Sequence, residues 1–159
     1  MIAVHTDRLA DLVALYAEYA ACIDEERFDD WPGFFTEDCV YRVVPRENHE
    51  AGYPLATISL KGTAGLRDRV YGMTSTLFHA PYYQRHIVSL PRIVGTEGGA
   101  IRVEANYLVL RTKRDEPSEV FNTGRYVDRV VETDGGLRFR EKLCIFDSEL
   151  IPNSLIYPI

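Results

Sequence analysis

Five side chains in this sequence are of the types that perform acid–base chemistry: Asp24, Asp38, Tyr41, His86 and Tyr107. A carboxylate or an imidazole can act as a base, while tyrosine hydroxyls donate hydrogen bonds to the charge that develops on a substrate. Such a set would serve a lyase or isomerase if the fold brought the five together around one pocket. A structural role is the alternative, because Asp24 and Asp38 occupy ordinary capping or turn positions and His86 falls on an expected strand.

Other kinds of chemistry lack their sequence signatures. The four histidines are never spaced four apart on one helix, and no Cys-x-x-Cys pair accompanies them: His5, His49, His79 and His86. The glycine-containing segments 62–65 and 95–99 match neither the dinucleotide pattern nor the P-loop, and the Gly-x-Ser-x-Gly turn of a serine nucleophile is absent. We therefore expect this chain to hold no metal and no cofactor.

The composition is that of an ordinary globular domain. The chain has 159 residues, with 46% hydrophobic and 26% charged residues and a formal net charge of −6, which disfavours binding to nucleic acid. No apolar run approaches the roughly 20 residues of a membrane span, and the first residues carry acids where a signal peptide would be apolar. Cys22, Cys39 and Cys144 are odd in number and lie among apolar neighbours, which is typical of buried free thiols. We expect one cytoplasmic domain over residues 1–159, with no nucleic-acid or membrane partner.

The charged residues are unevenly distributed. Residues 1–38 contain 10 acidic and 2 basic residues, whereas the basic residues of the whole chain comprise 15 arginines and only 3 lysines. Arginine is the cation favoured at interfaces and in partly buried pairs, so this excess favours contacts with partners, although a solvated helix face explains the acidic segment equally well.

Helical periodicity dominates the first part of the chain. Apolar residues recur at helical spacing over 6–24, and Pro32 suits the first turn of a second, short helix. Strands are expected at 39–45 and 55–61, separated by a polar loop, and a helix at about 63–73. These segments form a helical part, 6–35, and a mixed part, 39–73.

Alternation of apolar and polar residues dominates the remainder. Four long runs, 84–94, 100–112, 119–132 and 137–146, are separated by turn-forming residues and predict an antiparallel meander over 84–147 with bulges and strong curvature. The apolar tail, 148–159, should pack across another surface. Helices followed by a long curved sheet predict an α+β fold in which the sheet wraps around the helices as a cone.

An ordered set of short motifs resembles the small (beta) subunits of Rieske-type aromatic-ring-hydroxylating dioxygenases, above all those that accompany salicylate-, terephthalate- or anthranilate-type hydroxylases. The motifs extend over nearly the whole chain: Ile23-Asp24, Trp31-Pro32-x-Phe34-Phe35-Thr36-x-Asp38-Cys39-x-Tyr41-Arg42-Val43, Asn48-His49, Gly52, Leu66-x-Asp68-Arg69, Arg85-His86, Asp147, Ser154-Leu155 and Tyr157-Pro158.

This resemblance implies an NTF2-like (cystatin-like) fold, as in nuclear transport factor 2 and scytalone dehydratase, which agrees with the cone. It also implies a non-catalytic structural subunit in aromatic compound catabolism, assembled as a beta trimer with iron-bearing alpha subunits in an α3β3 complex. The Rieske [2Fe–2S] centre and the mononuclear Fe(II) would both be held by the alpha subunit.

Such an assembly would account for the arginine excess, because arginine–carboxylate pairs suit buried polar interfaces. We expect subunit contacts to involve several arginines of the meander: Arg85, Arg92, Arg102, Arg111, Arg125, Arg129, Arg138 and Arg140. Two alternatives remain open. The first is a stand-alone lyase or isomerase of the scytalone dehydratase or ketosteroid isomerase type, using the five acid–base side chains; the second is a module that binds a small ligand.

Overall fold

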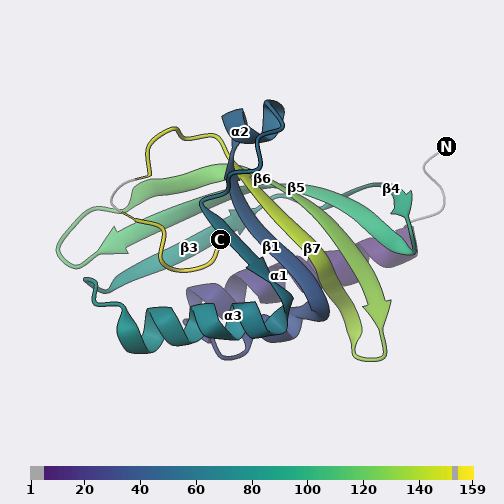
Figure 1. The fold of residues 1–159 in the computed structure, drawn as a ribbon, viewed down its shortest axis with the longest axis horizontal. Helices are drawn as coiled ribbons and strands as arrows, with labels where there is room; N and C mark the ends of the chain where they lie inside the picture. The colour runs from purple at the N-terminus through teal and green to yellow at the C-terminus, as the bar shows by residue number, and fades with distance from the viewer. Residues whose placement is uncertain (1–5, 152–153) are drawn as a thin grey trace.

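The computed structural model describes residues 6–151 and 154–159 (Figure 1). Its elements follow in the order α1 (Thr6–Asp24), the 3-10 helix η1 (Trp31–Phe34), β1 (Phe35–Pro45), α2 (Arg46–Glu50), β2 (Ile58–Lys61), α3 (Gly62–Tyr71), the π-helical turn η2 (Gly72–Thr76), β3 (Tyr82–Val88), β4 (Arg92–Glu97), β5 (Ala100–Lys113), β6 (Glu119–Thr133) and β7 (Gly136–Phe146). No described helix is long and apolar enough to cross a membrane.

One mixed sheet contains all the described strands, in the order β2-β1-β7-β6-β5-β3, with β4 also paired to β5. All neighbouring strands are antiparallel except β1 and β7, which run parallel with Val43 opposite Cys144. The register shifts within the β4–β5, β5–β6 and β6–β7 pairs, as well as between β1 and β7. These irregularities confirm the predicted bulges, which increase the local twist of long strands.

Helices α1 and α3 lie on the concave side of the sheet, which curves around them, whereas α2 lies at the end of β1 (Figure 1). Helix α1 packs against β3, and α3 packs against β1. The predicted cone of sheet around helices is therefore confirmed. Aromatic side chains fill the space between the layers, where Tyr19 makes edge-on contacts with Phe35 and Phe139, and Trp31 with Tyr41. Such edge-to-face pairs add to the free energy gained by burying the rings.

Several element boundaries differ from the sequence prediction. Residues 46–50, expected as part of a loop, form helix α2, which begins directly after Pro45. The run 84–94, expected as one strand, is divided between two strands, β3 and β4, because residues 89–91 are not part of a strand. Both β3 and β4 pair with β5. Strand β1 begins four residues earlier than expected, at Phe35, since the short helix ends at Phe34.

The tail contributes to the core, as its apolar composition predicted. Leu155, Tyr157 and Ile159 are all buried. The Tyr19 hydroxyl donates to the Ile159 carbonyl oxygen at 2.8 Å, while the Ile159 N–H donates to the Tyr41 hydroxyl at 2.9 Å. The tail thereby occupies interior space that a large central pocket would need.

Candidate functional site

Asp24 and His86 form a buried pair. Helix α1 ends at Asp24, and its packing against β3 places the carboxylate beside the inward-facing His86. One carboxylate oxygen, Oδ1, lies 2.6 Å from Nδ1 of His86, and the other accepts the His86 backbone N–H at 2.8 Å. The His86 side chain is fully buried and that of Asp24 is 6% exposed. The bond from the backbone N–H fixes the carboxylate, which contacts the imidazole through Nδ1.

The other three acid–base candidates lie apart from this pair. Asp38 is exposed on β1, where its carboxylate accepts a hydrogen bond from the Thr36 hydroxyl at 2.8 Å. The Tyr41 hydroxyl is bonded to the tail at Ile159. The Tyr107 hydroxyl donates to Asn122 Oδ1 at 2.7 Å. The structure thus brings together Asp24 and His86 only, and does not assemble the five side chains around one pocket.

A groove of about 350 Å³ runs between α1 and the segment 85–91. Asp24 and His86 line it, and the remaining walls are mostly small or apolar: Val13, Tyr16, Ala17, Ala20, Ala21, Val88, Leu90 and Pro91, with Glu25, Arg85 and Ser89 as polar members. An apolar concavity with a few fixed polar groups is the usual form of a small-molecule site.

A buried charge pair lies between β6 and β7. The Lys142 ammonium donates to Asp128 Oδ2 at 2.8 Å, and both side chains have no exposed surface. The Tyr16 hydroxyl also donates to Asp128, as does the Leu143 backbone N–H. Lys142 Nζ lies 3.5 Å from the centre of the Tyr126 ring, with Tyr16, Tyr19 and Phe139 further out. Burial raises the pKa of the Asp128 carboxyl, and the Lys142 ammonium partly offsets that rise.

Sequence reasoning missed both residues of this pair. The sequence feature that could reveal their burial is the phase of the apolar–polar alternation along each strand. On β6, Asp128 falls in the same inward register as Tyr126 and Val130. Lys142 is inward on β7 only because a bulge between β6 and β7 shifts the alternation just before it. Charged residues in an inward phase are buried and paired. The alternation of β6 alone therefore predicts that Asp128 points inward, whereas the alternation of β7 alone would place Lys142 on the outer face.

The predicted interface arginines divide between the two faces of the sheet. Arg111 points inward, with a 4% exposed side chain whose Nε donates to Glu119 at 2.9 Å, and its guanidinium lies 4.6 Å from the centre of the Phe121 ring. This placement argues against a subunit contact for Arg111. The other seven lie outside the core, exposed or half-buried: Arg85, Arg92, Arg102, Arg125, Arg129, Arg138 and Arg140.

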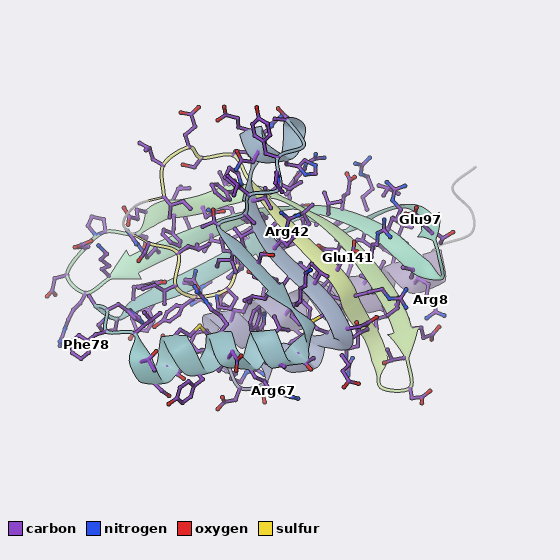
Figure 2. The ribbon with its side chains drawn as sticks, in the orientation of Figure 1. Arg8, Arg42, Arg67, Phe78, Glu97 and Glu141 are labelled. Atoms are coloured by element: carbon purple, nitrogen blue, oxygen red, sulfur yellow. The ribbon has the colours of Figure 1, made fainter. Side chains whose placement is uncertain are left out.

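Two of these outer arginines already have acidic partners. Arg92 pairs with Glu104 at 2.7 Å. Arg129 pairs with Glu97 at 3.0 Å and with Glu141 at 3.2 Å. Figure 2 shows these two carboxylates on neighbouring parts of the sheet. Such exposed pairs add little to stability by themselves. Their effect is to leave charged groups of both signs on the outer face.

Among the described residues, no group of three or more His, Cys, Asp or Glu side chains could hold a metal ion. Cys22, Cys39 and Cys144 are buried free thiols. Burial raises the pKa of the Cys144 thiol to about 12 and those of Cys22 and Cys39 to about 11, which makes all three poor nucleophiles.

Comparison with known proteins identifies the family. Residues 5–142 match the SnoaL-like domain. The chain is 35% identical over 149 residues to the anthranilate 1,2-dioxygenase small subunit of Burkholderia cepacia, covering 94% of this chain and 92% of that one. It is 30% identical to the terephthalate 1,2-dioxygenase terminal oxygenase component subunit beta 1 of a Comamonas species, covering 93% and 96% of the two chains.

A solved structure agrees with these relatives. A protein from Novosphingobium aromaticivorans, described as the beta subunit of an aromatic-ring-hydroxylating dioxygenase, superposes with a TM-score of 0.89 at 32% identity, covering 98% of this chain and 99% of that one. Since sequence and fold both match over nearly the full length, the resemblance read from the motifs is confirmed. The chain has a SnoaL-like, NTF2-like fold and belongs to the small (beta) subunits of aromatic-ring-hydroxylating dioxygenases.

Proposed function

We propose that this chain is the non-catalytic structural subunit of an oxygenase that attacks an aromatic acid of the anthranilate or terephthalate type. It assembles in the cytoplasm with an iron-bearing alpha subunit, as a beta trimer within an α3β3 complex. The alpha subunit holds the Rieske [2Fe–2S] centre and the mononuclear Fe(II). The unreactive buried thiols suit a reducing compartment, where disulfides rarely form.

An apolar patch on the outer face of the sheet is the observation that carries this proposal. Tyr83 and Ile87 on β3 and Val120 on β6 are 74%, 55% and 58% exposed. The strand register joins them through β5, because Ile87 lies opposite Leu108 and Val120 lies opposite Leu110. An apolar surface that extends over three neighbouring strands is typical of a protein contact, whereas scattered exposed apolar residues are not.

Two of the predicted arginines border this outer patch. Arg85 lies opposite Leu110 on β5, and Arg125 lies opposite Asn106, on the same outer face. Both are exposed. An apolar centre with arginine at its margin has the composition of a subunit interface. Arg85 and Arg125 are therefore the members of the predicted set that we place at subunit contacts.

Assembly can be tested by replacing the three exposed residues of the outer patch. The triple variant Tyr83→Ser, Ile87→Ser, Val120→Ser should remain folded, because none of the three side chains belongs to the core. We expect size-exclusion chromatography with light scattering to give a trimer for the wild-type chain and a monomer for the variant. Co-expression with the alpha subunit should yield an active complex for the wild type and much less complex for the variant.

Leu55→Ser provides the matched control, since Leu55 is 71% exposed but lies outside β3, β5 and β6. This variant should assemble like the wild type. A wild-type chain that stays monomeric and does not bind the alpha subunit would refute the proposed function. A triple variant that assembles as well as the wild type would refute the placement of the interface.

A further inference from the structure

Leu77 and Phe78 form an apolar projection, which we call the knob. Phe78 is fully exposed and Leu77 is 49% exposed, and Figure 2 shows Phe78 projecting from one end of the molecule. A single half-exposed apolar side chain is common on protein surfaces. Two consecutive ones, with a phenyl ring that no described residue covers, leave unused the free energy that burial would provide. The knob therefore has the properties of an anchor for a partner.

The backbone on both sides of the knob is held in place. The Leu77 N–H donates to the Gly72 carbonyl oxygen at 2.8 Å, at the end of the π-helical turn η2. On the other side of Phe78, the His79 ring contacts the buried Tyr157 ring edge-on, with 5.3 Å between their centres. A side chain presented on an anchored segment loses little further conformational entropy when it binds.

The groove between α1 and segment 85–91 is the matching concave surface. Its volume is about 350 Å³, and Leu90 on its wall is 75% exposed. An apolar cavity of about 150 Å³ is large enough for benzene, so the groove can admit a phenyl ring. Two of its polar members already have partners, because Asp24 contacts His86 and Glu25 pairs with Arg27 at 2.8 Å. The groove therefore suits an apolar side chain.

The knob and the groove are separate surfaces of one chain. The knob comes before β3 begins at Tyr82, whereas the groove wall 85–91 extends beyond the end of that strand at Val88. Phe78 is fully exposed and does not line the groove of its own chain. Two complementary surfaces at different places on one chain make a head-to-tail contact between copies, and such contacts generate closed rings.

The knob also continues the outer patch. Tyr83 and Ile87 of that patch follow it on β3, and no acidic residue occurs between positions 71 and 91. Each aromatic ring can bury about 150–250 Å², so Phe78 and Tyr83, with Leu77 and Ile87, supply a large share of the roughly 800 Å² per partner that a stable interface needs.

We propose that the knob of one copy inserts into the groove of the next copy in the beta trimer. Each chain then contributes one knob and one groove, and all three pairs are filled only when the ring closes. The inference rests on the trimer of the proposed function. It goes further in naming the two surfaces that meet and the direction in which the copies are joined.

Two substitutions disable one surface each. Phe78→Ser removes the knob, and Ala17→Arg fills the groove from its α1 wall, where Ala17 is exposed. Analytical ultracentrifugation over a range of concentrations should show that each variant associates at least tenfold more weakly than the wild type. The matched controls should trimerise like the wild type: Leu55→Ser, and Ala14→Arg, whose exposed site on α1 lies outside the groove.

Mixing the two variants tests the direction of the contact. The intact knob of Ala17→Arg still fits the intact groove of Phe78→Ser, but the ring can no longer close. We therefore expect a heterodimer at concentrations where neither variant associates alone. The proposal fails if both variants trimerise as tightly as the wild type, if the mixture gives no heterodimer, or if Phe78→Ser remains a trimer and loses only the alpha subunit. Any of these results with a trimeric wild type leaves the proposed function standing, whereas a wild-type chain that neither trimerises nor binds the alpha subunit refutes that function itself.

Discussion

The buried pair of Lys142 and Asp128 makes the sharpest prediction about stability. Lys142→Met removes the ammonium and leaves the Asp128 carboxylate without exposed surface, bonded only to the Tyr16 hydroxyl and the Leu143 N–H. Breaking a buried pair in this way costs about 3–5 kcal/mol, because the remaining charge is neither hydrated nor paired. The cation–π contact with the Tyr126 ring, at 3.5 Å, is lost as well.

The assay is urea unfolding followed by circular dichroism. The free energy of unfolding should fall by about 3–5 kcal/mol, and the melting temperature by about 6–20 °C for a chain of this size. The double variant Asp128→Asn, Lys142→Met should recover at least half of the loss, because it no longer buries an unpaired charge. A loss below about 1 kcal/mol, or a double variant less stable than Lys142→Met, would refute the reasoning.

The same variant has a predictable pH dependence. Burial raises the pKa of Asp128 and Lys142 lowers it, so removing Lys142 moves the pKa further above its unfolded value. The folded variant then binds a proton more readily than the unfolded chain, and its free energy of unfolding rises as the pH falls through the folded pKa. The deficit relative to the wild type should narrow between pH 7 and pH 4, and a deficit that stays constant or widens contradicts this explanation.

The remaining predictions concern glycines and thiols. Gly124→Ala should cost more than 3 kcal/mol or abolish soluble expression, because its Cβ would overlap backbone atoms of β7, whereas Gly33→Ala, which meets open space, should be nearly neutral in urea unfolding. The three cysteines should not react with Ellman's reagent at pH 8 in the native chain and should all react in guanidinium, because burial raises the pKa of Cys144 to about 12 and those of Cys22 and Cys39 to about 11. Rapid labelling of the native chain would show that these thiols are less buried than described.

Local patterns in the sequence predicted local structure well. The helical spacing of apolar residues gave α1, and Pro32 marked the first turn of the short helix, because proline needs no N–H there. The short helix α2 was missed since its residues are all polar and carry no apolar periodicity, although Pro45 directly before it is compatible with a helix start.

Contacts between distant segments could not be predicted in the same way. The pairing of Asp24 with His86 depends on how α1 packs across the sheet, and alternation along β3 says only that His86 points inward. Neither residue identifies the other from its sequence neighbours. The order of helices and alternating strands indicated the cone, and the family resemblance agreed with it, but neither could indicate that the Tyr41 hydroxyl bonds to Ile159 of the tail.

The parallel pairing of β1 with β7 has a consequence for how the chain folds. Partners such as Val43 and Cys144 lie about 100 positions apart, whereas the β5–β6 and β6–β7 pairs close through short turns. Joining such distant segments must overcome a large loss of chain entropy before any contact compensates it, so domains of this kind fold in milliseconds to seconds. We therefore expect the hairpins to form first. Until β1 docks, β7 is an unpaired edge strand, and the β1 segment of another nascent chain could pair with it. Correct folding of each subunit therefore competes with misassembly at the β1–β7 pairing.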